Sequence, residues 1–188
     1  MTGFNKIFWG LILVLLDFRL ESFDILPDFI GYWIIYTGLK TLASYNDNFD
    51  KAKMYAVTLS LLSITNFFPW QIPIERLQFS LPIIEIILLG TLLTVLDLVM
   101  IYHVCKGISQ MALENDLIEL SNKANNRWQL YLYITIGLLI VIPIVMLIPE
   151  IAVALGIPLV IMAVIILVML ASLIKSADNA FRDIIQVR

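Results

Sequence analysis

Long apolar runs with few polar interruptions make up most of this chain. A helix needs about 20 residues to cross a hydrocarbon layer of roughly 30 Å, with a range of about 17 to 25. Six stretches fit that window, at 4–20, 25–44, 53–70, 81–105, 129–148 and 152–174. The runs are continuous, and backbone polar groups in lipid need partners within the segment, so the pattern favours helices over barrel strands. We therefore predict an all-α integral membrane helical bundle of about six transmembrane helices, forming a single transmembrane domain over 1–188.

Composition excludes a soluble domain. Of the 188 residues, 61% are hydrophobic and 14% are charged, whereas soluble domains carry about 25% charged residues. A chain of this length cannot hide so much apolar surface in its own core. The bilayer itself is therefore the first predicted partner.

Basic residues predict the orientation, because short cytoplasmic loops are enriched in Lys and Arg. If the N-terminus is cytoplasmic, ten of the twelve basic residues fall on the inner side, and Arg19 and Arg76 alone fall outside. Both termini are accordingly predicted to be cytoplasmic. A re-entrant pair formed by the first two stretches would give the same count, so that alternative stays open.

Acidic residues, in contrast to the basic ones, are well represented on the predicted outer side. Seven of the fifteen lie at or near the predicted outer side: Asp17, Glu21, Asp24, Asp28, Glu75, Glu85 and Glu150. An excess of acids at an entrance raises the local concentration of cations.

The polar segment 108–126 separates the fourth and fifth stretches. Met111, Leu113, Leu117 and Leu120 recur at helical spacing, which predicts a cytoplasmic helical linker. A solvated linker and a docking helix for another protein are both compatible with this pattern.

Asp24 and Asp28 flank Pro27 at the start of the second stretch. Acids and proline suit the first turn of a helix, where N–H groups are unpaired and the partial charge is positive. Capping explains both acids. A binding role stays open because Tyr32 and Tyr36 follow Asp28 at four-residue intervals and so share its face.

That face also carries Gly31 and Gly38 beside it, which predicts close helix contact and hydrogen bonds across the bundle. It forms either a structural polar seam or a route for a cation or proton.

In the fourth stretch, Asp97 lies inside the apolar run and Glu85 near its outer start. A charge in the membrane is costly, so such residues are protonated, paired or in contact with water, unless they snorkel to the interface.

Gly90, Thr91 and Thr94 lie near the face of Asp97, a second small and polar stripe that we expect to meet the one on the second stretch. The fifth and sixth stretches are nearly featureless. Tyr131 in the fifth fits an aromatic belt at the membrane interface.

Several chemistries lack a signature in the sequence. Cys105 is the one cysteine and His103 the one histidine, so we expect no disulfide within the chain, no metal site and no cofactor. Nucleotide-binding, metalloprotease and nucleophile-elbow motifs are missing, as is a basic patch for nucleic acid.

The stretches "NKIFWGLILVLLDF" and "DILPDFIGYWIIYTGLKTL", followed by "FDKA", resemble a family of small multi-pass membrane proteins of Bacillus and Clostridium type bacteria. The resemblance covers roughly the first fifty residues, and its most distinctive element is LPDFIGY. It implies a bacterial cytoplasmic membrane and assigns no catalytic residue.

Taken together, these patterns favour a membrane protein without enzymatic activity that binds or transports a small cation, a proton or a cationic compound. Its candidate binding residues are Asp28, Tyr32, Tyr36, Glu85 and Asp97. The alternatives are a membrane partner subunit or signalling component that docks another protein through 108–126, and an intramembrane enzyme.

Overall fold

The computed structural model describes residues 2–15, 19–20, 23–24, 28–64, 81–147 and 149–186. This part of the chain contains six helices: α1 (Gly3–Leu15), α2 (Asp28–Leu42), α3 (Asp47–Ser63), α4 (Leu81–Glu114), α5 (Ile118–Leu147) and α6 (Pro149–Gln186). Its other regular element is a short antiparallel hairpin of β1 (Arg19–Leu20) and β2 (Phe23–Asp24). The predicted all-α class is confirmed.

Three helices in the described part of the chain are long and apolar enough to cross a membrane. Their apolar segments are Ile87–Glu114 in α4, Ile118–Val145 in α5 and Ile157–Arg182 in α6. Helices α1, α2 and α3 have 13, 15 and 17 residues, and so extend over only about 20 to 26 Å at 1.5 Å per residue. The chain thus has the helices of a membrane protein, in two length classes.

The first predicted stretch, 4–20, is longer than the helix that it contains. Helix α1 ends at Leu15, and Arg19 pairs with Asp24 in the hairpin. The apolar run is followed by Asp17, Arg19 and Glu21, whose charges are costly on a lipid-facing helix. The described helix therefore ends before these charges.

Helix α3 begins earlier than the predicted stretch 53–70. Asn46 caps it, accepting a hydrogen bond from the backbone N–H of Asn48 at 2.9 Å, and this satisfies one of the unpaired donors of the first turn. Residues 65–70 of that stretch lie outside the described residues.

The segment 108–126 is not one helix. Its first part continues α4 and its last part begins α5, and the chain reverses at Asn115–Leu117. Asp116 has a φ of 58°, and the N–H groups of Asp116 and Leu117 bond the carbonyls of Leu113 and Ala112. This left-handed residue with two backward bonds ends α4.

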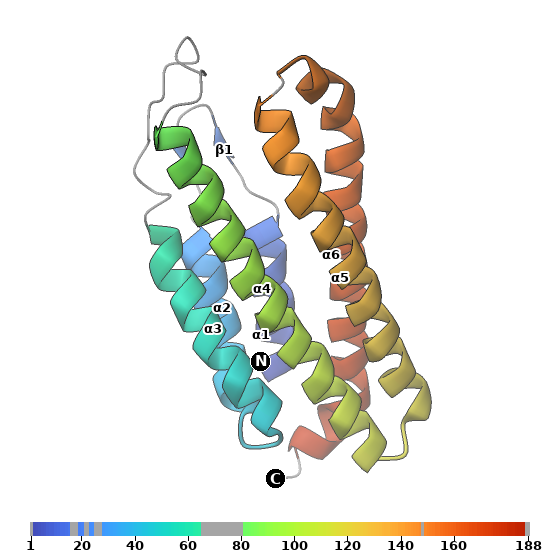
Figure 1. Cartoon of the computed structure of the whole chain (residues 1–188). Coiled ribbons are helices and arrows are strands. Elements are labelled where there is room, and N and C mark those ends of the chain that lie inside the picture. The colour runs from blue at the N-terminus through green and yellow to red at the C-terminus, as the bar shows by residue number, and fades with distance from the viewer. Residues whose placement is uncertain are drawn as a thin grey trace.

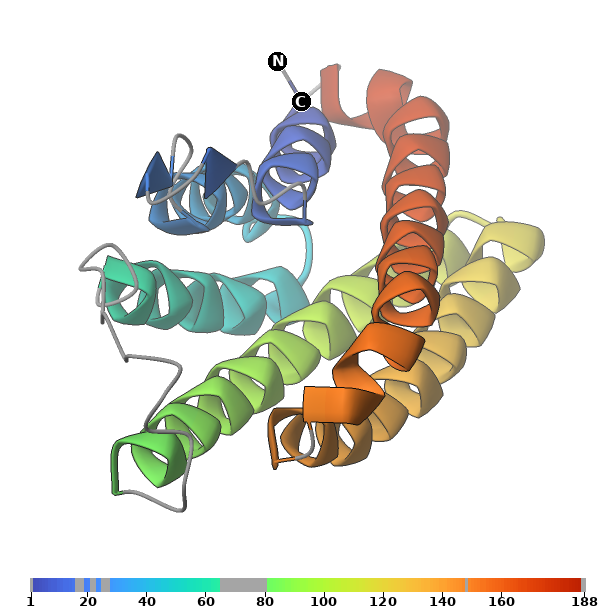
Figure 2. The same cartoon turned by 90° about the horizontal axis from the view of Figure 1, so that it is seen from above.

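The six helices form a closed ring. Each helix packs against the next along the chain, and α6 packs back against α1, as the view from above shows (Figure 2). The turns between α2 and α3 and between α4 and α5 lie at the same end of the ring as the C-terminus (Figure 1). We call this the basic end, because Lys40, Lys51, Lys106 and Lys123 lie near these turns.

Glycines set the approach of α1 to α2. A Cβ atom built on Gly10 would lie 2.8 Å from the carbonyl oxygen of Gly31, and one on Gly38 would lie 2.6 Å from that of Gly3. The two pairs are seven residues apart on each helix, so they repeat along the antiparallel contact. We refer to these four residues as the glycine seam; it confirms the close contact predicted for Gly31 and Gly38.

Fully buried aromatic rings pack together towards the basic end. Phe4 of α1 contacts Phe49 of α3 and Phe181 of α6, with ring centroids 5.9 and 5.8 Å apart, and all three are fully buried. Thr2 donates a hydrogen bond to Asp178, which also pairs with Arg182. These contacts close the ring where α6 returns to α1.

Candidate functional site

Three polar side chains from three helices meet inside the ring. Tyr131 Oη of α5 donates a hydrogen bond to Asp97 Oδ2 of α4 at 2.5 Å. Tyr32 Oη of α2 donates to Asp97 Oδ1 at 3.3 Å. We call Tyr32, Asp97 and Tyr131 the phenol–carboxylate cluster. The shorter bond has the length of about 2.5 to 2.7 Å expected between a hydroxyl and a carboxylate.

The ring geometry explains why tyrosines make these contacts. Helix α2 packs between α1 and α3, and α4 packs between α3 and α5, so a side chain that joins α2 to α4 must reach across the interior of the ring. Tyr32 and Tyr131 are long enough to do so, and both are buried. Asp97 consequently points into the ring instead of snorkelling towards the headgroups.

Asp97 has hydrogen-bond donors but no basic partner among the described residues. The ion pairs in that part of the chain join Lys53 to Asp50 and Arg182 to Asp178. Asp28 lies one turn before Tyr32 on α2. The cluster thus holds one carboxyl group and two phenols, and the carboxyl group can serve as the counter-charge of a positive ligand.

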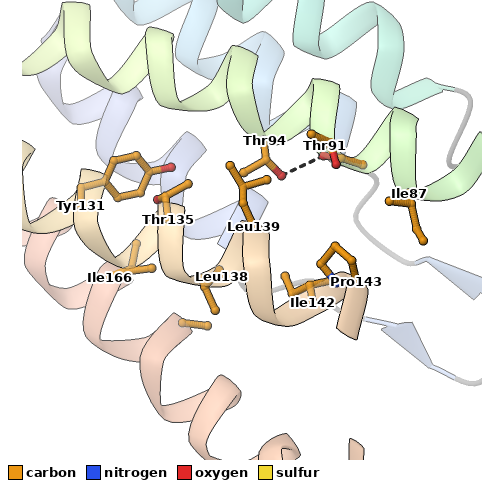
Figure 3. A pocket seen from close by; sticks show the side chains of 12 residues that line it. Ile87, Thr91, Thr94, Tyr131, Thr135, Leu138, Leu139, Ile142, Pro143 and Ile166 are labelled. Carbon is orange, nitrogen blue, oxygen red and sulfur yellow. Dashed lines mark hydrogen bonds between the residues drawn. The ribbon is translucent and has the colours of Figure 1, made fainter. Parts of the chain in front are cut away.

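A cavity of about 320 Å³ runs between α4, α5 and α6, and Tyr131 is the cluster residue that lines it (Figure 3). Tyr131 and Thr135 of α5 contribute hydroxyl groups, and the Thr135 hydroxyl lies beside the Tyr131 phenol. The walls are otherwise mostly aliphatic, with Leu138, Leu139, Ile142, Pro143, Ala163 and Ile166 among them. This volume lies at the small end of the range for small-molecule sites, roughly 300 to 1,000 Å³.

The burial of the lining residues changes along this cavity. Tyr131, Thr135 and Ile166 are 6%, 3% and 6% exposed, whereas Gly90 and Ile142 are exposed. Helices α4 and α5 meet at their turn and separate towards the other end (Figures 1 and 2). The cavity is therefore closed at the cluster and open where the two helices separate.

The structure brings some of the five candidate residues named from the sequence together and leaves others apart. Tyr32 and Asp97 are in contact, and Asp28 lies near them on α2. Tyr36 is partly buried and its ring lies 5.2 Å from that of Trp33, outside the cluster. Glu85 lies in α4, and its side chain is outside the described part.

The small and polar stripe of α4 does not meet α2. Gly90, Thr91 and Thr94 line the cavity that α5 and α6 complete, and Thr94 donates its hydroxyl to the Gly90 carbonyl at 2.8 Å. The expectation that the two stripes face each other is wrong for these residues, because α3 lies between α2 and α4 in the ring. Within the described part of the chain, the hydrogen bond from Tyr32 to Asp97 joins α2 to α4.

Sequence reasoning missed Tyr131 and Thr135. Tyr131 fits an interfacial belt, and the fifth stretch shows no strong motif, but a phenol and a hydroxyl four residues apart in an apolar run share one helix face. That spacing is the signal that would have singled them out. Both side chains are directed towards the interior.

The described residues contain no group of three or more His, Cys, Asp or Glu side chains that could hold a metal ion. His103 is partly buried, and its Nδ1 lies 3.2 Å from Asn48 Oδ1. Its ring stacks on Tyr55. The contacts of His103 are therefore those of a polar network between α3 and α4.

Comparisons with known protein families, with curated proteins and with solved structures find no match. The resemblance of the first fifty residues to a bacterial membrane family therefore stays a prediction.

Proposed function

We propose that this protein binds, and carries across the membrane, a small cation, a proton or a cationic compound, with Asp97 as the counter-charge. The observation that supports this most strongly is the phenol–carboxylate cluster. A carboxyl group in a membrane-spanning segment is costly unless it is protonated, paired or solvated, and Asp97 has two phenol donors but no basic partner in the described part of the chain. A positive ligand would complete the site.

We further propose six crossings of a bacterial cytoplasmic membrane, with the basic end facing the cytoplasm. The positive-inside rule supports this orientation. The hydrogen bond between Thr2 and Asp178 places the start of α1 and the last turns of α6 on the same side of the bundle, as an even number of crossings requires. The resemblance of the first fifty residues supports the choice of membrane.

The partner-subunit alternative receives less support from the structure. Of the four apolar residues in 108–126 that suggested a docking helix, Met111 and Leu120 are buried and Leu117 packs on the core. Only Leu113 is exposed, at 55%. The stripe is thus used mainly for packing within this chain.

Flux measurements on purified protein in sealed vesicles test the proposed function. The vesicles are assayed for movement of H⁺, Na⁺, K⁺ and tetramethylammonium. We expect movement of at least one of these, reduced tenfold or more by Asp97→Asn, because that change removes the charge and keeps the size of the side chain. Asp116→Asn is the matched control; it makes the same chemical change in the exposed turn between α4 and α5.

Absence of flux, or equal flux in the wild type and Asp97→Asn, would contradict transport at this site. Stable copurification of a protein that is lost on Leu113→Ser, without any cation flux, would instead favour the partner-subunit alternative.

A further inference from the structure

We propose that the ligand of this site is an alkylammonium ion, with its N–H group at Tyr131 and its alkyl body in the cavity between α4, α5 and α6. This inference rests on the proposed function, since it names the class of cation that Asp97 attracts.

The position of Tyr131 determines what a ligand would meet at the closed end of the cavity. Its O–H is donated to Asp97, while its side chain lines the cavity, with the hydroxyl directed towards Thr135 and Thr94 (Figure 3). A phenol oxygen retains lone pairs when its proton is donated, and donation to a carboxylate makes that oxygen a better acceptor. A protonated amine can therefore donate to Tyr131 Oη with the charge of Asp97 directly behind it.

The walls of the cavity distinguish between classes of cation. Ca²⁺ and Mg²⁺ require six or more oxygen ligands arranged around the ion. The cavity offers hydroxyl groups at Tyr131 and Thr135 of α5 and at Thr91 and Thr94 of α4. Thr94 donates its hydroxyl to the Gly90 carbonyl, and Leu138, Leu139 and Ile142 form much of the wall. Such a wall cannot replace the water around a metal ion, whereas it suits the apolar part of an amine. An alkylammonium ion has one polar end and an apolar body. The buried hydroxyl groups of Tyr131 and Thr135 suit the first, and the aliphatic part of the wall suits the second.

The open end of the cavity indicates the route of the ligand. Gly90, Thr91 and Ile142 lie at this end and are exposed, and they belong to the apolar segments of α4 and α5 that are suited to cross a membrane. An alkyl body concentrates an amine in the bilayer. The ligand can therefore enter sideways from the lipid, with no need for an aqueous route to Asp97.

Two glycines provide a matched pair of variants. A Cβ atom on Gly90 or on Gly137 would meet no atom within 4 Å, so both sites tolerate a larger side chain. Gly90 lines the cavity and Gly137 does not. Gly90→Leu would fill the cavity, while Gly137→Leu adds the same bulk to α5 outside it.

The test is equilibrium binding of radiolabelled n-octylamine to the protein in phosphatidylcholine nanodiscs at neutral pH. We expect saturable binding, with the dissociation constant raised tenfold or more by Asp97→Asn and by Gly90→Leu, and unchanged by Gly137→Leu. Octan-1-ol and octane-1-sulfonate should not compete, because they lack the positive charge. Tetramethylammonium should compete weakly, because it has neither an N–H group nor an alkyl body.

Each contrary result identifies what has failed. Octylamine binding that depends on Asp97 but not on Gly90 would overturn the placement in the cavity. Binding of tetramethylammonium or K⁺ that depends on Asp97 and is as tight as that of octylamine would overturn the ligand class and leave the proposed function standing. If no cation binds in an Asp97-dependent way, both proposals fail.

Phosphatidylethanolamine carries the same primary ammonium group as a free alkylamine. Repeating the measurement in discs that contain this lipid separates the two sources. A raised apparent dissociation constant for octylamine would show that the lipid competes for the site, and an unchanged value would identify a free amine as the ligand. Either result keeps the ligand class and names its source.

Discussion

At the scale of single residues, Asp97 differs in its surroundings from Asp50 and Asp178, the two acids with a basic partner in the described part of the chain. Asp50 pairs with Lys53 at 2.5 Å, and Asp178 pairs with Arg182 at 3.1 Å. Asp97 instead accepts hydrogen bonds from two phenols. A bond to a charged group contributes about 1.5 to 3 kcal/mol, and the bond from Tyr131 is the shorter of the two.

Removing the phenol hydroxyls should therefore have unequal effects. We expect Tyr131→Phe to lower the free energy of unfolding by about 1.5 to 3 kcal/mol, and Tyr32→Phe to lower it by a smaller amount, because the bond from Tyr32 is longer. Steric-trap unfolding in lipid bicelles measures both. Tyr133→Phe, at a residue 71% exposed, is the control and should change nothing. Equal effects of all three variants would show that the cluster does not stabilise the fold.

Only part of this site could be predicted from the sequence. Asp97 was identifiable because a charge inside an apolar run is rare and costly, and Tyr32 because it shares a helix face with Asp28. Tyr131 was not, since a tyrosine near the end of an apolar stretch also fits an interfacial belt. Which face of α5 turns inward depends on packing against α4 and α6.

At the scale of helices, the glycine seam shows how small residues position the site. Gly3 and Gly10 let the backbone of α1 approach that of α2. Tyr32 follows Gly31 directly in the sequence, so the face of α2 that packs on α1 fixes the direction in which Tyr32 points. The position of the phenol therefore depends on glycines that do not touch it.

Alanine should consequently lower the free energy of unfolding at a glycine of the seam and raise it at a glycine that faces open space. Gly38→Ala places a methyl group 2.6 Å from the Gly3 carbonyl oxygen, and we expect it to lower the free energy of unfolding by about 1 to 3 kcal/mol. Gly137→Ala meets open space and should raise it by up to about 1 kcal/mol, since alanine favours helix. A Gly38→Ala protein as stable as the wild type would mean that α1 and α2 do not approach each other closely at the glycine seam.

The positions of the helices could be predicted from the sequence, but their full lengths could not. Apolar runs located all six helices. They did not reveal that α4 and α6 extend to 34 and 38 residues, because a hydropathy window ends where polar residues begin, while a helix continues as long as its other faces are packed. Residues beyond Asp97 on α4, from Met100 to Ala112, include many that are buried against neighbouring helices.

At the scale of the whole molecule, the closed ring creates an interior that can hold a polar cluster. Side chains of helices that are not neighbours in the ring can meet in this interior, as Tyr32 and Asp97 do. Aromatic packing closes the ring near the basic end, through Phe4 and Phe181. The cavity opens away from that end, which gives the molecule two distinct halves.

The proposed six crossings predict which positions are accessible from each side. In a Cys105→Ala background, Asn115→Cys lies in the turn between α4 and α5, and Arg19→Cys lies in the hairpin. A membrane-impermeant maleimide applied to intact cells should label Arg19→Cys, and should label Asn115→Cys only after permeabilisation. Labelling of both residues from outside would contradict the proposed orientation. If neither cysteine is labelled in intact cells, the result would favour the re-entrant arrangement of α1 and α2.

The most direct test of the central claim follows the Asp97 carboxyl group itself. Infrared difference spectra of the protein in nanodiscs are recorded with and without n-octylammonium chloride, tetramethylammonium chloride or KCl. Our account predicts that at least one of these cations perturbs a carboxyl stretching band, that the change is lost in Asp97→Asn, and that it persists in Asp116→Asn. The same cation-induced spectrum in Asp97→Asn and in the wild type would contradict a cation site at the phenol–carboxylate cluster.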